Sequence, residues 1–288
     1  MRDFSSGNAW LSINTATLRP KWTMPQIADG CARHGIPAIS PWRDQVATCG
    51  LQVASRAIRA AGLVLSGYCR GGMFPAADQA GLAAALEDNF RAVDEACELG
   101  SPCLVLVVGA LPGALEGRAA HRDIGRSRAE VVDGIAALLD YARPRSMPLA
   151  IEPLHPMYAA DRACVNTLEQ ALDICDALDP AGGGALGVAV DLYHTWWDPK
   201  LQAQIQRAGA RRLLAFHVCD WLTPTTDLLL DRGMMGDGVI EIRKVRGWME
   251  AAGYAGHSEV EIFSANNWWQ RPGDEVLATC IQRHRTVV

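Results

Sequence analysis

Short apolar runs alternate with longer amphipathic stretches along this chain. The apolar runs lie near 9–14, 36–40, 62–67, 102–108, 148–152, 186–191, 212–218 and 257–263. Between them apolar residues recur at every third or fourth position, for example over 78–99, 127–143 and 167–178, which is the spacing of an amphipathic helix. Such alternation of strands and helices predicts a parallel α/β sheet. Eight strand–helix units favour its closure into a (β/α)8 TIM barrel over an open sheet.

The boundaries of these segments support one continuous domain. Thr167 and Gln170 are spaced as a capping box at the start of a helix, and Gly100 follows another helix where a left-handed C-cap is expected. No Pro- or Ser-rich linker divides the 288 residues, and α/β barrels typically need about 250 residues. We therefore expect a single domain over 1–288. The longest irregular segments, 109–122, 153–166 and 219–239, follow strands and should form the mouth of the barrel.

The last four predicted strands end in residues that can bind a metal. The runs PLAIE, LGVAVD and LLAFH end at Glu152, Asp191 and His217, and SEVEIF contains Glu259 and Glu261. A barrel gathers the carboxyl ends of its strands around one mouth, so these residues should converge. Buried carboxylates need a partner or a cation, and separate salt bridges or helix caps would require four independent coincidences. Strand alternation places Glu259 and Glu261 on the same side, which leaves the fourth ligand open.

The chemistry of this set favours particular ions. Carboxylate oxygens with a single imidazole suit Mn, Mg or Co better than a structural zinc site, although zinc is also a possible occupant.

The bulk composition narrows the partners and the compartment. A net charge of −5 without basic clusters argues against nucleic acid. The nine cysteines are odd in number and form no CxxC pair, which indicates a reducing environment. The first residues have no apolar signal-peptide core, and no run reaches the roughly 18 apolar residues of a membrane span. We expect a cytoplasmic protein without a membrane partner.

Five segments of the second half together resemble a known superfamily. They are LAIEPLHP (149–156), VDLYHTWWDP (190–199), FHVCD (216–220), RGMMGDGVIEI (232–242) and GYAGHSEVEIF (253–263). They look like the xylose-isomerase-like TIM-barrel superfamily, and within it the sugar isomerase and epimerase branch with ketose 3-epimerases and inosose-processing enzymes. The resemblance implies one divalent ion on Glu152, Asp191, His217 and Glu261. It selects Glu261 over Glu259 because the superfamily's last ligand sits seven residues after the Tyr of a GYxG turn.

The resemblance also implies an activity. By analogy with the epimerases, Glu152 and Glu261 would bind the ion and also move protons through an enediolate that the ion stabilises. We therefore expect a metal-dependent isomerase or epimerase of a ketose or related sugar or polyol ketone. The substrate should be unphosphorylated, because no glycine-rich phosphate loop or Arg/Lys cluster follows the last two strands.

Other residues near the mouth are candidates for substrate contacts. His194 and Arg232 match family positions that hydrogen-bond substrate oxygens, whereas His155 stands where relatives vary. Six tryptophans come shortly after strand ends: Trp42, Trp196, Trp197, Trp221, Trp268 and Trp269. They could line a pocket for a glycoside, with Trp42 and Trp221 as candidate contacts, or they could pack helices against the barrel or subunits against each other. Three histidines fall outside the pattern and are expected to be solvated: His34, His121 and His284.

Three other functions are compatible with the same fold. A lyase or dehydratase acting on a 3-keto-glycoside or inosose could use the same ion and bases. An abasic-site endonuclease would need three zinc ions, more histidines and a basic face, which this acidic chain lacks. A barrel that only binds a ligand or a partner is the third, because fold does not fix function. By resemblance we expect a homo-oligomer, a dimer or a tetramer.

Overall fold

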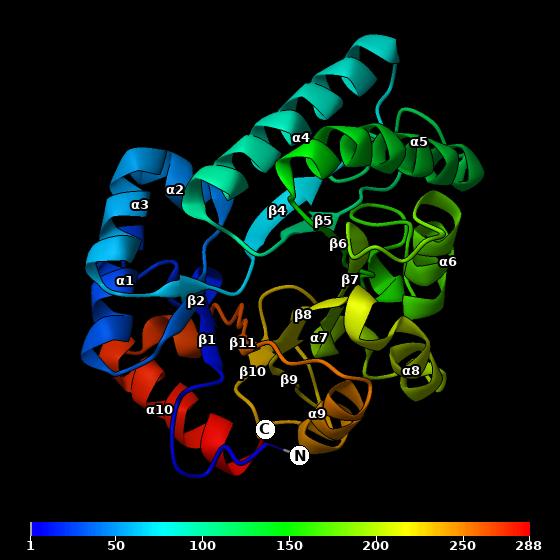
Figure 1. Cartoon of the computed structure of the whole chain (residues 1–288). Coiled ribbons are helices and arrows are strands. Elements are labelled where there is room, and N and C mark those ends of the chain that lie inside the picture. The colour runs from blue at the N-terminus through cyan, green and yellow to red at the C-terminus, as the bar shows by residue number, and fades with distance from the viewer. Residues whose placement is uncertain (1) are drawn as a thin grey trace.

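The computed structural model describes residues 2–288, which form a nine-stranded parallel sheet rolled into a nearly closed barrel (Figure 1). The strands follow one another around the barrel in the order β3 (Val64–Leu65), β2 (Ala38–Ser40), β1 (Leu11–Asn14), β11 (Ser258–Val260), β8 (Leu213–Val218), β7 (Leu186–Asp191), β6 (Leu149–Ile151), β5 (Leu104–Val107) and β4 (Tyr68–Gly72). This confirms the predicted TIM barrel.

The third barrel strand differs from its prediction, because it is split into β3 and β4. β3 pairs with β2, and β4 pairs with β5, so the two pieces together span the seam of the barrel. A parallel bridge from Trp42 to Cys69 narrows that seam. The apolar run at 62–67 covers β3 only, because β4 reads as Tyr-Cys-Arg-Gly-Gly and lacks an apolar pattern.

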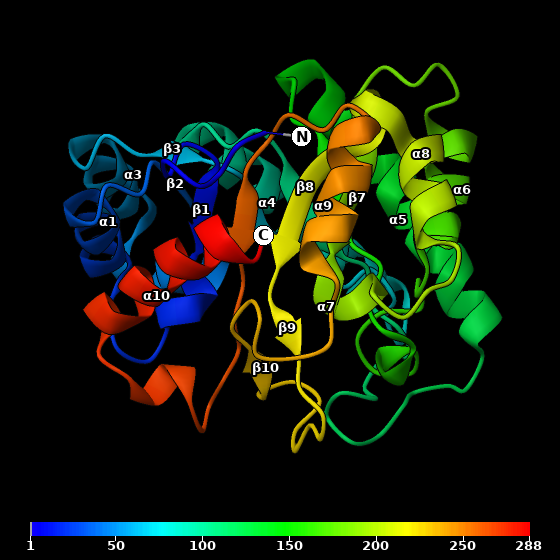
Figure 2. The same cartoon turned by 90° about the horizontal axis from the view of Figure 1, so that it is seen from below.

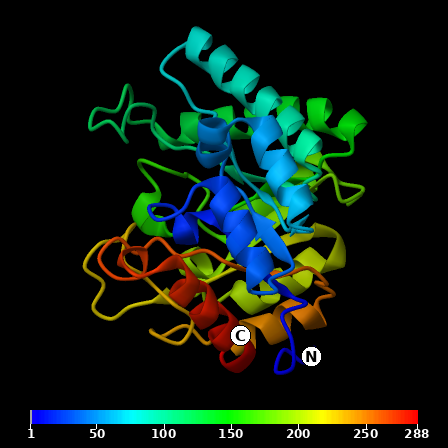
Figure 3. The same cartoon turned by 90° about the vertical axis from the view of Figure 1, so that its left-hand side faces the viewer.

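Helices surround the barrel, as they should when both faces of a parallel sheet are buried (Figure 1). Those of the first sixty residues, in blue, cover the side that lies on the left in Figure 1 and faces the viewer in Figure 3. The helices are α1 (Met24–Arg33), α2 (Arg43–Cys49), α3 (Leu51–Ala60), α4 (Gln79–Leu99), α5 (Ile124–Ala142), α6 (Leu168–Leu178), α7 (Leu192–Thr195), α8 (Leu201–Arg212), α9 (Ile242–Ala251) and α10 (Gly273–Thr286). None of those in the described chain meets the length and apolarity that a membrane span requires.

The predicted helix boundaries are largely correct. Thr167 Oγ accepts a hydrogen bond from the Gln170 N–H at 3.2 Å. In a capping box the Gln170 side chain would accept a hydrogen bond from the N–H of Thr167. It accepts instead from the N–H of Asn166, one residue earlier, at 2.7 Å. Gly100 ends α4 in the left-handed region, with φ at 71°.

Alternation along the strands decides which residues reach the barrel interior. On β6, Leu149 and Ile151 join the large core beneath the helices, whereas Ala150 belongs to a separate cluster of mostly small inward-facing residues. That cluster contains Cys69, Cys103, Val105, Ala150, Ala189 and Ala215. Glu152, Asp191 and His217 each follow one of its alanines by two positions, so they also face inward, one layer nearer the mouth.

The carboxyl ends of the strands carry the irregular segments predicted from the sequence. β8 runs into the two-residue strand β9 (Asp220–Trp221), which pairs with β10 (Arg232–Gly233) below the barrel (Figure 2).

On the outer side, His284 of α10 is fully buried and its ring stacks on Phe4 with centroids 4.4 Å apart. The prediction that His284 is solvated is therefore wrong, because the N-terminal segment covers this face of α10.

Candidate metal centre

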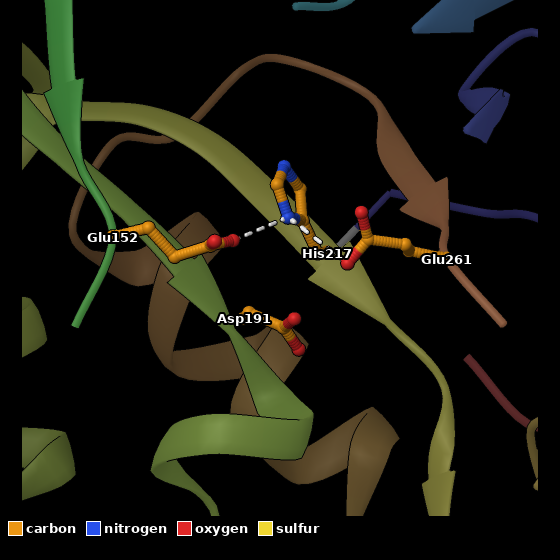
Figure 4. A group of neighbouring side chains, drawn as sticks. All are labelled: Glu152, Asp191, His217 and Glu261. Atoms are coloured by element: carbon orange, nitrogen blue, oxygen red, sulfur yellow. Dashed lines mark ion pairs between the residues drawn. The ribbon is translucent and has the colours of Figure 1, made fainter. Parts of the chain in front are cut away.

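Four side chains from four strand ends meet inside the mouth of the barrel. Glu152 directly follows β6, Asp191 ends β7, His217 lies on β8, and Glu261 directly follows β11. One ligand atom from each lies within 4.8 Å of the others, and all four residues are buried. Figure 4 shows Glu152 and Glu261 pointing toward the imidazole of His217 from opposite sides, with Asp191 below them. The structure thus brings together the predicted set.

The imidazole of His217 presents Nδ1 to the two glutamates. Nδ1 lies 2.9 Å from Oε1 of Glu152 and 4.0 Å from Oε2 of Glu261. Within the described chain, His217 Nδ1 and Glu152 Oε1 are both buried and neither has a hydrogen-bond partner of good geometry. Such atoms are costly to bury unless something else satisfies them. A divalent cation would do so, and the donor set fits one.

Glu259 lies behind His217 and is only 1% exposed. It is level with His217 in the β11–β8 register, and its Oε1 lies 3.4 Å from Nε2 of the imidazole. The same carboxylate accepts hydrogen bonds from Asn14 Nδ2 at 2.8 Å and from Ser66 Oγ at 2.7 Å. Glu259 therefore belongs to a deeper layer, where it can orient the imidazole for a ligand at Nδ1.

Arg232 places a guanidinium directly beside two of the acids. Its Nη1 lies 3.1 Å from Oδ2 of Asp191 and 3.0 Å from Oε2 of Glu261. The guanidinium also stacks over the rings of Tyr193 and Phe263, 4.4 and 4.9 Å from their centroids. Packing and ion pairing together fix Arg232 beside the site.

The pKa values reflect this crowding of charges. Burial raises the pKa of Glu261 to about 8, although Arg232 and His217 act in the opposite direction. Burial alone would also raise the pKa of Asp191, but Arg232 and the two histidines lower it below its usual value. Burial opposes the protonation of His217, yet Glu259 and Glu152 raise its pKa well above normal. A cation at this centre would relieve the repulsion among the three carboxylates.

A cavity of about 280 Å³ opens onto these acids, and Glu152 and Glu261 line it. Three of the predicted substrate contacts, His194, Arg232 and Trp42, also line it. Burial lowers the pKa of His194 to about 3, so this ring is uncharged at neutral pH.

His155 and Trp221 do not line the cavity. Their rings stack on one another with centroids 5.1 Å apart. The backbone N–H of His155 donates to Nδ1 of His194 at 3.3 Å, so this pair supports His194 from behind.

The cavity wall also contains residues that the sequence pattern does not predict there. They are Arg19, Arg70, Arg162 and Phe263, whereas Trp269, which also lines the cavity, is one of the tryptophans predicted near the mouth. The arginines lie outside the strand-end pattern and give no signal in the sequence.

Solved structures resemble this one along nearly the whole chain. A protein from Sinorhizobium meliloti 1021 has 58% sequence identity and a TM-score of 0.91, covering 97% of this chain and 98% of its own. The IolI protein, solved with a zinc atom, has 18% identity and a TM-score of 0.80, covering 96% and 97%. A D-allulose 3-epimerase from Methylomonas sp. has 16% identity and a TM-score of 0.75, covering 98% and 99%. At such low identity the last two show the fold alone.

No protein of curated function matches the sequence. The profile of one protein family does match it, over residues 28–280, and that family is described as a xylose isomerase-like TIM barrel. This range holds β2 to β11 and all four residues of the candidate metal centre. The chain therefore belongs to the xylose isomerase-like TIM-barrel family.

Proposed function

We propose that this protein is a divalent-metal-dependent isomerase or epimerase acting on a ketose or a related sugar or polyol ketone. One observation carries the proposal. Two buried glutamates, Glu152 and Glu261, approach His217 from opposite sides at the end of a sugar-sized cavity (Figure 4). The fold family and the D-allulose 3-epimerase neighbour support the enzyme class.

The ion would be held by Glu152, Asp191, His217 and Glu261, and Mn, Mg, Co or Zn could occupy this set. When bound, it would draw electron density from a sugar oxygen and make the adjacent C–H more acidic.

The two glutamates then supply the proton transfers. A carboxylate oxygen of one removes the proton from one face of the carbon, and the other returns a proton to the opposite face. A base works best when its pKa lies near the working pH; burial raises the pKa of Glu261, and the bound ion would act in the opposite direction and keep it ionised. Inversion at one carbon is epimerisation, and return of the proton to the neighbouring carbon is isomerisation.

His194 and Arg232 would hold the substrate's oxygens. His194 is uncharged, so it can hydrogen-bond a hydroxyl without adding charge to the site. Arg232 is fixed by Asp191 and Glu261, so its guanidinium need not reorganise when the substrate arrives.

The proposal is tested by deuterium incorporation. The protein, supplied with Mn²⁺, is incubated in D2O with D-fructose, D-tagatose, D-allulose or an inosose, and the products are followed by NMR. Exchange with inversion or carbonyl migration, and without loss of a group, is the expected result. Glu152→Gln and Glu261→Gln should each lower the rate by at least about 100-fold, because each removes a proton carrier.

Glu87→Gln is the matched control, since Glu87 is exposed on α4 and far from the barrel interior. It should leave the exchange rate unchanged. Absence of exchange with these ketones and with their carboxylated and phosphorylated counterparts, in protein that has bound Mn²⁺, would refute the proposal.

A second candidate is a lyase acting on a 3-keto-glycoside or an inosose. The apolar side of the cavity favours it, because Trp42, Phe263 and Trp269 offer more aromatic surface than a free sugar needs. Release of water from the inosose, or of the aglycone when a 3-keto-glycoside is added to the same D2O experiment, would select this reaction over epimerisation.

A further inference from the structure

The cavity beside the candidate metal centre contains two arginines that the proposed chemistry does not use. Arg70 belongs to β4, and Arg162 lies in the loop between β6 and α6. Both line the same cavity as Glu152 and Glu261. They are about ninety positions apart in the chain, so the fold brings them together.

A β-bulge gives Arg70 its position. Cys69 pairs with Val105 and Gly71 pairs with Leu106, so the residue between them has no partner on β5. Bulges of this kind redirect a side chain and are frequent beside active sites. Burial, with the nearby Arg162 as the next cause, lowers the pKa of the Arg70 guanidinium.

Neither arginine is neutralised by the protein in the way that the other arginines of the cavity are. Arg232 is paired with Asp191 and Glu261, and Arg19 is paired with Asp44. Among residues 2–288, the side chains of Arg70 and Arg162 form no ion pair or hydrogen bond with the protein. The Arg162 guanidinium only lies over the ring of Tyr158, 5.5 Å from its centroid, and its Nε is buried without a partner.

The charges around the cavity also leave Arg70 and Arg162 without compensation. A divalent ion together with Arg232 would offset the negative charges of Glu152, Asp191 and Glu261. Arg70 and Arg162 would then leave the cavity positive, and it stays positive even if the deeper Glu259 is counted. Partly buried guanidinium groups without a counterion are unfavourable, and a fork of N–H donors matches a carboxylate or a phosphate.

We propose that Arg70 and Arg162 form an anion subsite, and that the substrate is a sugar derivative carrying a carboxylate or a phosphate. This inference rests on the proposed function and narrows its substrate class. The sequence predicts an unphosphorylated substrate because no basic cluster follows the last two strands. The arginines come instead from the third barrel strand and from the loop after β6.

The test compares three six-carbon polyols that differ only at C1: sorbitol, which is neutral, gluconate, which has a carboxylate, and sorbitol 1-phosphate. Their affinities are measured by calorimetry with Mn²⁺ present, for the wild type and for Arg70→Gln and Arg162→Gln. We expect gluconate or sorbitol 1-phosphate to bind at least about tenfold more tightly than sorbitol, as charge-assisted hydrogen bonds allow. Which of the two wins distinguishes the carboxylate from the phosphate.

Each variant should lose most of this preference and keep its affinity for sorbitol, which also shows that it is folded. Arg56→Gln is the matched control, because Arg56 is exposed on α3, and it should behave as the wild type. Equal affinities for all three polyols in the wild type would overturn the proposal, and so would a preference that survives in both variants.

The D2O experiment separates the two proposals. If neutral ketones exchange but anions gain no affinity, only the anion subsite fails. If anions bind through the two arginines but neither neutral ketones nor their carboxylated and phosphorylated counterparts exchange, only the proposed activity fails.

Discussion

Replacing Glu259 with glutamine removes one negative charge from behind His217 and leaves the shape of the site almost unchanged. The amide can be satisfied locally. Its oxygen can still accept from Asn14 and face Nε2 of His217, while its NH2 group donates to Ser66 Oγ. Ser66 can in turn donate to Ser12, whose hydroxyl lies 2.7 Å away. The substitution therefore isolates the effect of the charge.

The size of that effect follows from the role of the imidazole. A carboxylate facing Nε2 makes Nδ1 a stronger donor to a cation, and such outer partners typically contribute about 10- to 100-fold in metal affinity, or about 1.4–2.7 kcal/mol. We expect Glu259→Gln to weaken Mn²⁺ binding by this factor in calorimetric titration of EDTA-treated protein. Glu87→Gln should have no effect, and His217→Ala should abolish binding.

Two results would refute this reasoning. One is an affinity of Glu259→Gln that stays within about twofold of the wild type, which would show that the charge does not act through His217. The other is a decrease in the free energy of unfolding, measured in EDTA, that is as large as the decrease in the free energy of metal binding. That result would show that glutamine disrupts the barrel interior instead.

The remaining predictions concern stability. Mn²⁺ at about 100 times its dissociation constant should stabilise the wild type by about 2.7 kcal/mol in urea unfolding, and His217→Ala should gain nothing. Desolvation lowers the pKa of buried His284 to about 3, and the nearby Arg246 and Arg2 add to the shift. The neutral ring therefore stabilises the fold fully above pH 6.5, and this contribution declines as the pH falls toward 3. Between pH 8 and pH 5 the wild type should lose about 2 kcal/mol more than His284→Phe, and equal losses would contradict the burial argument. Gly72→Ala should cost about 3 kcal/mol or more, because φ is +106° and the new Cβ would lie 2.0 Å from the Val107 carbonyl oxygen, whereas Gly7→Ala, with open space around it, should cost little.

The strand-end residues could be predicted because alternation and barrel geometry act together. Once a run is assigned to a parallel barrel strand, its last residue must lie at the mouth, and this suffices for Glu152, Asp191 and His217. The choice between Glu261 and Glu259 could not be made this way. Both face inward, and which layer each occupies depends on the stagger of β11 against β8, which local patterns do not encode.

The wall of the cavity was harder to predict because loops and irregular strands build it. Arg70 sits at a bulge, where the period of two breaks and the sequence reads as a glycine-rich turn. His155 and Trp221 come from mouth loops as expected, but their rings pack on each other behind His194 instead of lining the cavity. Whether a loop side chain faces a pocket depends on the path of the whole loop.

The pairing of β1 with β11 has a consequence for how the protein matures. Leu11 pairs with Ser258, so this ladder joins residues 247 positions apart and can form only after β11 has been synthesised. Glu261 lies just beyond β11, whereas Glu152, Asp191 and His217 belong to strands made earlier. A nascent chain would therefore hold three of the four groups and lack the last. Tight capture of an ion would wait for barrel closure, so metal uptake would mark the end of folding rather than guide its beginning.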